Sequence, residues 1–290
     1  MNKLNNGTMI PTIGYGVFRM TDQKECEEAV LNALKAGYRF IDTASAYGNE
    51  EAVGKAIERS GIPREELFIS TKLWITNMSY EEAKNGFETS LKRLGLDYVD
   101  LYIIHQPYGD YYGAWRALEE LYQEGKIKAI GVDNFNQERL ADFMFWNKIK
   151  PMVNFLECNP FFQREDELEY LNTKDIQMLA WSPLSAGHND LFSNETLKNI
   201  ADKYHKSIAQ VVLRWLTQRS IIPVVKSSHI ERMKENRDIF DFELDAEEMK
   251  EISLLDTGHT CFKPRNTGER VEAFLKEAVD GHAPSGKKAE

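Results

Sequence analysis

Four residues that can hold or transfer a proton follow three successive apolar runs of the chain. The run YRFID ends on Asp42, LFISTK ends on Lys72 and VDLYIIH ends on His105, while Tyr47 follows Asp42 by five residues. Apolar runs of this length are typical of strands in a parallel sheet. In parallel α/β barrels, polar residues at the C-terminal ends of the strands form the catalytic site. The spacing therefore favours a single proton-handling site.

These residue types together suit the reduction of a carbonyl group. A tyrosine titrates near pH 10, and a neighbouring ammonium group lowers the pKa of the phenol. A carboxylate can hold that ammonium, and a neutral imidazole can orient a substrate oxygen. Such a set protonates a carbonyl oxygen while a hydride reaches the carbon. Taken singly, each residue has a simpler interpretation: Asp42 as a helix cap, Lys72 as a solvated charge, and His105 and Tyr47 as packing residues.

The composition of the chain excludes several classes of protein. Its 290 residues are 42% hydrophobic and 28% charged, which is ordinary for a globular protein. The net charge of −10 is opposite in sign to that of a general nucleic-acid binder. No apolar run approaches the roughly 20 residues of a membrane helix, and we see no signal peptide. Three widely spaced cysteines predict reduced thiols in a cytoplasmic protein, and six scattered histidines predict no metal site.

Segments typical of strands and helices alternate along the chain. The predicted strands span residues 13–17, 38–42, 67–72, 99–105, 127–132, 152–156, 176–181 and 221–225. The predicted helices span residues 22–35, 50–59, 80–94, 112–123, 137–147, 165–172, 195–204, 208–219 and 230–237. Ser79 is a candidate N-cap of the third helix. About eight strand–helix units predict an α/β protein, a (β/α)8 TIM barrel that forms a single domain over residues 1–280.

The alternative architecture is a doubly wound sheet, which more often carries a GxGxxG turn after its first strand. The sequence Gly14-Tyr15-Gly16 is too short for that motif, so the barrel is favoured. A further helix is predicted at residues 246–255, outside the eight units. The polar tail at residues 281–290 contains Gly, Pro and Ser and is expected to be disordered.

Several segments resemble the signature segments of the aldo-keto reductases. They are GYRFIDTASAYGNEEAVGKAI (37–57), ISTKLW (69–74), DLYIIHQP (100–107), IGVDNF (130–135) and the segment 225–242. AWSPLSAG (180–187) is most similar to the prokaryotic 2,5-diketogluconate-reductase-like branch, and the similarity runs from about residue 11 to residue 258. The resemblance implies the same barrel, with Tyr47 as the general acid, Lys72 and Asp42 tuning it, and His105 orienting the carbonyl.

The segment that follows the eighth predicted strand concentrates positive charge in an otherwise acidic protein. Lys226, Arg232, Lys234 and Arg237 lie within 13 residues, VKSSHIERMKENR. Positive charge after the last barrel strand suits a phosphate group, although a solvated helix face would look the same. The resemblance implies that Lys226, Ser227 and Arg232 hold a 2′-phosphate, which favours NADP(H) over NAD(H). It implies further cofactor-binding positions at Val17, Asp42, Asp133, Asn134, Phe155, Trp181, Ser182, Leu184, Ser228, Glu235 and Asn236.

The chain departs from the family pattern where the nicotinamide carboxamide is held. Asp133 stands where the family usually has Ser, and Phe155 stands where it has Gln, while Asn134 is retained. Asp133 can still accept a hydrogen bond, whereas Phe155 cannot form one. We therefore expect Asp133 and Asn134 to hold the nicotinamide and Phe155 to pack beside it. Trp181 matches the position that stacks on the nicotinamide.

The substrate side of the predicted site combines apolar walls with a polar rim. Phe18, Trp74 and Tyr108 are the expected walls, and His105 is expected to contact the substrate. Gln106 replaces the Trp that is common after the catalytic His, which makes the rim more polar. The C-terminal loop that sets specificity in many family members is expected to be short.

We therefore predict an NADPH-dependent reductase of small aldehydes, ketones or α-dicarbonyls. The expected partner is a small carbonyl substrate, and a monomer or weak homodimer is expected. Two alternatives remain open. One is an aldolase that forms a Schiff base on Lys72, although Asp42 beside that lysine would keep the amine protonated. The other is a cofactor-binding redox sensor with little turnover, which the changes at Asp133 and Phe155 would allow.

Overall fold

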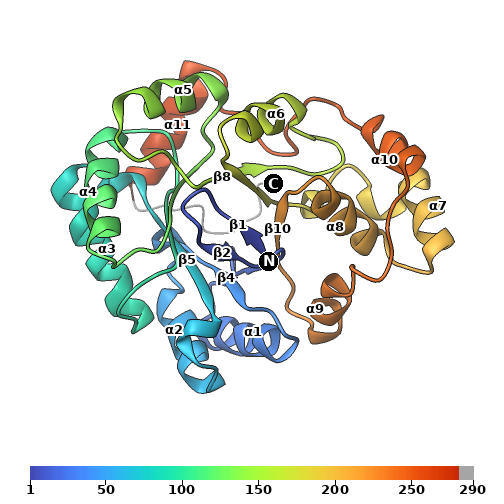
Figure 1. The fold of residues 1–290 in the computed structure, drawn as a ribbon, viewed down its shortest axis with the longest axis horizontal. Helices are drawn as coiled ribbons and strands as arrows, with labels where there is room; N and C mark the ends of the chain where they lie inside the picture. Colours follow the sequence, from blue (N-terminus) through green and yellow to red (C-terminus); the bar gives the residue numbers. More distant parts are fainter. Residues whose placement is uncertain (281–290) are drawn as a thin grey trace.

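Eight parallel strands form a closed barrel in the computed structural model, which describes residues 1–280 (Figure 1). The strand order around the barrel is β10-β3-β4-β5-β6-β7-β8-β9. The predicted (β/α)8 barrel is therefore confirmed, whereas the predicted disordered tail lies outside the described residues. The barrel strands are β3 (Gly14–Gly16), β4 (Phe40–Asp42), β5 (Phe68–Leu73), β6 (Leu101–Ile104), β7 (Ile130–Asp133), β8 (Val153–Glu157), β9 (Gln177–Trp181) and β10 (Ile222–Val225).

Helices surround the barrel, and most of them begin at a polar side chain that accepts a hydrogen bond from the first turn. The helices are α1 (Gln23–Lys35), α2 (Glu50–Ser60), α3 (Tyr80–Leu94), α4 (Tyr111–Gln123), α5 (Gln137–Trp146), α6 (Glu165–Thr173), α7 (Glu195–Tyr204), α8 (Ile208–Gln218), α9 (Ile230–Arg237) and α10 (Ala246–Ser253). The Ser79 hydroxyl accepts a hydrogen bond from the backbone N–H of Glu82, as predicted. Such caps pair N–H groups that the first helical turn leaves free.

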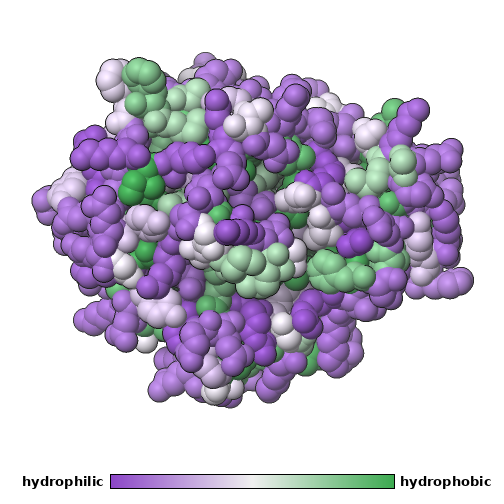
Figure 2. Space-filling model, in the orientation of Figure 1, coloured by the Kyte–Doolittle hydropathy of each residue, from purple (hydrophilic) through white to green (hydrophobic). Residues whose placement is uncertain are grey.

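An antiparallel hairpin that the sequence patterns did not predict, β1 (Asn2–Lys3) and β2 (Met9–Ile10), closes the N-terminal end of the barrel. The Asn5 side chain in its turn donates to the carbonyls of Pro151 and Asp175, which precede β8 and β9. Figure 2 shows the molecule in the orientation of Figure 1: hydrophilic residues cover most of this face, and apolar residues form small groups. The hairpin leaves the opposite end, where the strands finish, for a functional site.

The C-terminal segment contains a helix that the sequence patterns did not predict. After α10 the chain continues through residues 254–267 into an additional helix, α11 (Gly268–Val279). Thr267 caps this helix, and Phe274 and Ala278 are buried on one side of it. Helix α11 contacts the turn η3 (Ile75–Asn77) that follows β5, and in the view of Figure 1 it overlaps α5. The expectation of a short C-terminal loop is therefore wrong.

Candidate active site

The structure brings the four proton-handling residues together at the C-terminal end of the barrel. Asp42 is the last residue of β4, Lys72 lies near the end of β5, and His105 follows β6. Tyr47 closes a single 3₁₀ turn, η1 (Ser45–Tyr47), which follows β4. The Lys72 ammonium lies 2.6 Å from the Asp42 carboxylate and 3.5 Å from the Tyr47 hydroxyl. The rings of Tyr47 and His105 stand edge to face, with centroids 5.6 Å apart.

Hydrogen bonds fix the lysine at the centre of this group. Lys72 is 1% exposed and also donates to the carbonyl oxygen of Thr43 at 2.9 Å. Asp42 accepts a second hydrogen bond from the Ser70 hydroxyl at 2.6 Å. Burial raises the pKa of Asp42, while Lys72 and Ser70 oppose that rise. A buried charge pair with its remaining lone pairs satisfied is held in one geometry, and removing one partner would strand the other.

The pKa of Tyr47 differs from the sequence-based expectation. We expected Lys72 to lower it, but burial raises the pKa of Tyr47 well above its usual range, and Asp42 and Asp133 add to the rise. The reason is that the Lys72 charge lies closer to Asp42 than to the phenol. In the free protein Tyr47 is therefore a neutral phenol, which is the proton-donating form.

His105 is neutral and positioned beside the phenol. Burial lowers the pKa of His105 well below its usual range, and the positive charges of Lys72 and Arg265 lower it further. Its ring lies 5.0 Å from that of Trp74, edge to face. Within residues 1–280, its Nδ1 atom has no hydrogen-bond partner. A neutral imidazole can donate one hydrogen bond to a substrate oxygen without competing as an acid.

Of the predicted nicotinamide-binding residues, Asp133 ends β7, Asn134 follows it, Trp181 ends β9 and Phe155 lies in the middle of β8. Asn134 takes a left-handed backbone conformation with φ 64°, and its side-chain oxygen accepts a hydrogen bond from the Trp181 indole at 3.2 Å. Asp133 and Phe155 are partners across β7 and β8 and are both buried. The Phe155 ring centroid is 5.2 Å from the Lys72 ammonium. The two residues that depart from the family pattern therefore adjoin the proton-handling group.

The remaining predicted cofactor residues follow strands at the same end of the barrel. Val17 is buried after β3, and Ser182 and Leu184 follow β9. Tyr15 donates to the carbonyl oxygen of Ser227 at 2.5 Å, which anchors the loop between β10 and α9. Ser228 lies in that same loop.

Helix α9 carries the predicted phosphate-binding arginine. Arg232 is exposed and forms no ion pair within residues 1–280. By contrast, Lys234 pairs with Glu231 at 3.1 Å, and Arg237 donates to the carbonyl oxygen of Ala36 at the end of α1. Arg237 therefore joins two helices, and Arg232 is the guanidinium that can meet a ligand.

The other predicted cofactor residues in the loop after β10 and in α9 differ in their solvent exposure. Lys226 is exposed, and burial of part of its side chain lowers its pKa. Glu235 is half-buried and Asn236 is buried. Two exposed cations, Lys226 and Arg232, thus lie on either side of the start of α9, and helix N-termini commonly bind phosphate groups.

The predicted substrate residues surround Tyr47 and His105. Phe18 lies 5.0 Å from the Tyr47 ring, and Trp74 is buried against His105. Tyr108 packs against Phe274 of α11 with ring centroids 5.6 Å apart. Gln106 is buried, and its side-chain oxygen accepts a hydrogen bond from Arg265 at 2.8 Å.

The C-terminal segment adds site residues that our sequence reasoning missed. Arg265 reaches Gln106, Phe274 packs on Trp74 at 6.0 Å, and Phe262 packs on Trp181 at 5.5 Å. Glu157, 1% exposed at the end of β8, accepts from the backbone N–H of Cys261 and so ties this segment to the barrel. The apolar spacing of residues 271, 274, 275 and 278 after a Thr cap was the signal for α11.

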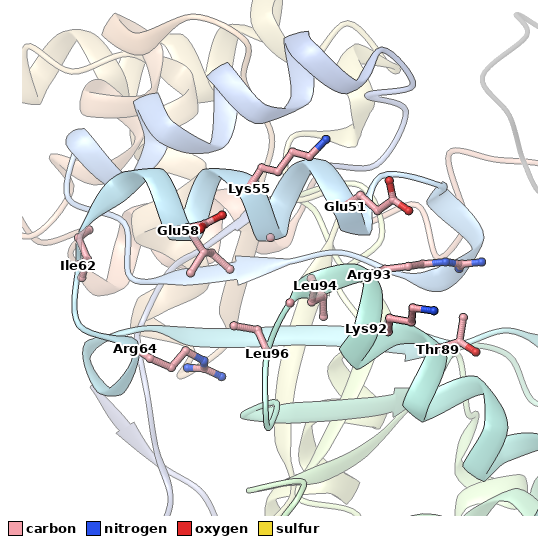
Figure 3. A pocket seen from close by; sticks show the side chains of 13 residues that line it. Glu51, Lys55, Glu58, Ile62, Arg64, Thr89, Lys92, Arg93, Leu94 and Leu96 are labelled. Atoms are coloured by element: carbon pink, nitrogen blue, oxygen red, sulfur yellow. The ribbon is translucent and has the colours of Figure 1, made fainter.

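A separate hollow lies on the outside of the barrel. It measures about 890 Å³ between α2 and α3, and its rim mixes acidic and basic side chains such as Glu51, Glu58, Lys55 and Lys92 (Figure 3). The helices approach closely there because Gly54 has no side chain: a Cβ atom would lie 2.2 Å from the Leu94 carbonyl oxygen. No candidate site residue lines this hollow.

The described residues contain neither a cluster of metal ligands nor a membrane-spanning helix. Residues 1–280 contain no group of three or more His, Cys, Asp and Glu side chains placed to hold a metal ion. The same part of the chain has no helix that is both long and apolar enough to span a membrane.

The chain is similar to known reductases. The chain is 48% identical over 254 residues to a glyoxal reductase of Bacillus subtilis, covering 87% of this chain and 91% of the relative. It is 40% identical over 259 residues to the methylglyoxal reductase DkgA of Escherichia coli, covering 88% and 93% of the two chains.

Solved structures show the same fold. An aldo-keto reductase from a Medee basin deep-sea metagenome library superimposes with a TM-score of 0.89 at 47% identity, covering 92% of this chain and 99% of the other. A Bombyx mori aldo-keto reductase in complex with NADP superimposes with a TM-score of 0.86 at 34% identity, covering 90% and 94%. The family model described as "Aldo/keto reductase family" matches residues 3–256. The chain therefore belongs to the aldo/keto reductase family.

Proposed function

We propose that the protein is an NADPH-dependent reductase of small aldehydes, ketones or α-dicarbonyls, with Tyr47 as the general acid. The observation that carries this proposal is the grouping of Tyr47, Lys72, Asp42 and His105 at one end of the barrel. The relatives named as glyoxal and methylglyoxal reductases support a small dicarbonyl as substrate.

Tyr47, Lys72, Asp42 and His105 each have a separate role in the reduction of the carbonyl group. The neutral phenol of Tyr47 donates its proton to the carbonyl oxygen as that oxygen becomes negative. Lys72, 3.5 Å away, stabilises the phenolate that remains, and Asp42 holds the ammonium in place. Neutral His105 donates a hydrogen bond that orients the carbonyl. The reduced cofactor, when bound, supplies the hydride to the carbonyl carbon.

The cofactor assignment rests on the loop after β10 and on α9. Arg232, Lys226 and Ser227 would hold the 2′-phosphate, because a guanidinium and an ammonium there meet a doubly charged group. Glu235 and Asn236 would border the adenine, and Ser182, Leu184, Ser228 and Val17 would line the rest of the cofactor site. The NADP complex of the Bombyx mori relative supports this choice.

A screen of NADPH consumption over a panel of carbonyl compounds tests the proposal. We expect oxidation of NADPH with glyoxal or methylglyoxal and much less with NADH. The panel should include simple ketones, because the walls Phe18, Trp74 and Tyr108 admit apolar groups while Gln106 and His105 admit polar ones. Absence of NADPH oxidation with every aldehyde, ketone and dicarbonyl would contradict the assignment.

The aldolase alternative is disfavoured by the position of Lys72. A Schiff base needs an uncharged amine, and this ammonium is buried with Asp42 at 2.6 Å. Borohydride in the presence of a dicarbonyl is therefore expected to trap no covalent adduct on Lys72. The sensor alternative predicts NADPH binding without measurable single-turnover oxidation, so a fast single turnover with glyoxal would exclude it.

Replacement of Phe155 by Gln is expected to tighten NADPH binding by a few-fold and to lower the melting temperature. The amide would offer the carboxamide a hydrogen bond that Phe155 cannot make, worth about 0.5–1.5 kcal/mol. It would also lose the packing of a ring that is 2% exposed. Fluorescence titration and calorimetry measure the two effects. Weaker NADPH binding would instead mean that the Phe155 ring itself supports the nicotinamide.

Two further properties are part of the proposal. Cys26, Cys158 and Cys261 are free thiols, and a reducing compartment such as the cytoplasm preserves them. Asp42, Lys72, Tyr47 and His105 contact one another within one chain, and we propose that the protein acts as a monomer or a weak homodimer. Analytical ultracentrifugation would test the assembly.

A further inference from the structure

Asp133 places an additional carboxyl group inside the proposed site. It is the last residue of β7 and is 3% exposed. One of its oxygens, Oδ2, lies 3.9 Å from His105 Nε2. The other, Oδ1, is buried without a hydrogen-bond partner in residues 1–280. A buried carboxyl oxygen without a partner is costly, so this geometry favours a ligand that arrives beside it.

The charged groups that face Asp133 come from several elements. Lys72 on β5 and Asp42 on β4 neutralise each other at 2.6 Å, and Tyr47 and His105 are neutral. Arg265, from the C-terminal segment, contributes a positive charge at the rim, where it donates to Gln106. Burial raises the pKa of Asp133 well above its usual range, Asp42 adds to the rise, and Lys72 and Arg265 oppose it.

The resemblance to the family implies an uncharged Ser at this position. Asp133 therefore adds a negative charge that is available only when the carboxyl is ionised. The nicotinamide ring carries a positive charge in its oxidised form and none in its reduced form. A nearby anion consequently distinguishes the two forms, because only the oxidised form gains Coulomb energy.

We propose that Asp133 raises the affinity of the protein for NADP⁺ relative to its affinity for NADPH. An uncharged residue at this position would give a lower ratio of the two affinities. The inference rests on the proposed function, since it requires the nicotinamide to lie beside Asp133 and Asn134. Its consequence concerns reaction direction. With the cofactor bound, loss of its hydride to the carbonyl carbon would leave the ring positively charged, and an ionised Asp133 beside it would stabilise that charge while Tyr47 donates its proton to the carbonyl oxygen. Reduction of bound carbonyl is thereby favoured over its reversal.

The test measures dissociation constants for NADP⁺ and NADPH by protein fluorescence, at mildly alkaline pH where ionisation of the carboxyl is favoured. The variants are Asp133→Asn, which keeps the shape and removes the charge, and Asp133→Ser, which restores the residue implied by the family. Asp97→Asn, at an exposed position in the loop before β6, is the matched control for the change of charge. We expect both Asp133 variants to weaken NADP⁺ binding by about tenfold and to change NADPH binding less than about twofold.

The possible outcomes separate this inference from the proposed function. If both cofactor forms weaken equally, or neither changes, Asp133 acts through packing or hydrogen bonding and the inference is overturned, while the proposed function stands. If the unmodified protein binds neither NADPH nor NADP⁺, both fail. If Asp133→Asn does not fold, as judged by its circular dichroism melt, Asp133→Ser supplies the same comparison. A selective loss of NADP⁺ affinity with unchanged behaviour of Asp97→Asn supports the inference.

Discussion

Replacement of Tyr47 by Phe is expected to lower kcat by about 10²–10⁴-fold, the usual contribution of a positioned general acid. The change removes only the hydroxyl that lies 3.5 Å from the Lys72 ammonium. The ring remains, so its contacts with Phe18 and His105 should persist. NADPH affinity should stay within about twofold of the starting value, because the phenol acts on the carbonyl oxygen.

Steady-state kinetics with a dicarbonyl and a fluorescence titration with NADPH measure these two quantities. Tyr170→Phe on α6 is a matched control that removes a phenolic hydroxyl away from the strand ends. It should leave kcat unchanged. Retention of more than about a tenth of the original kcat in Tyr47→Phe would show that another group supplies the proton.

Replacement of Arg232 by Ala is expected to reduce the preference for NADPH over NADH by roughly 10–100-fold. A hydrogen bond to a charged group contributes roughly 1.5–3 kcal/mol, and only NADPH carries the 2′-phosphate. Arg232 is exposed on α9 and unpaired within the described residues, so its loss should not disturb the fold. The ratio of kcat/KM for the two cofactors measures the effect.

Lys234→Ala provides the control on the same helix. It also removes a positive charge, but this lysine is paired with Glu231 at 3.1 Å. We expect a small change that is similar for both cofactors. An equal loss for NADPH and NADH in Arg232→Ala would mean that the arginine has a structural role and that another residue recognises the phosphate.

The barrel could be predicted because two signals in the sequence agree: apolar runs indicate single strands, and their alternation with helical segments indicates the architecture. Apolar runs such as YRFID and VDLYIIH are typical of interior strands, and a cap such as Ser79 marks where the next helix begins. Parallel strands with helical connections bring their C-terminal ends to one rim. Asp42, Lys72 and His105 meet there because each stands at the end of its strand.

Other features depend on contacts that sequence patterns do not encode. The pKa of Tyr47 depends on how closely Lys72 approaches Asp42, which requires three-dimensional distances. The sequence groups Arg237 with the phosphate-binding charges, whereas in the structure it donates to the carbonyl oxygen of Ala36, 201 positions away in sequence. The C-terminal segment lacks a family signature, so its contacts with Trp74 and Gln106 appear only in the folded chain.

Transfer of deuterium from NADPH, labelled at the transferable position of its nicotinamide, tests whether the protein moves a hydride from the cofactor to a carbonyl carbon. The labelled cofactor is mixed with the protein and methylglyoxal, and the alcohol product is analysed by mass spectrometry and NMR. We expect deuterium on the former carbonyl carbon in amounts equal to the NADPH oxidised, and almost none from Tyr47→Phe over the same time. Binding of NADPH without any labelled alcohol, or NADPH oxidation whose deuterium never reaches the carbonyl carbon, would contradict the proposed function.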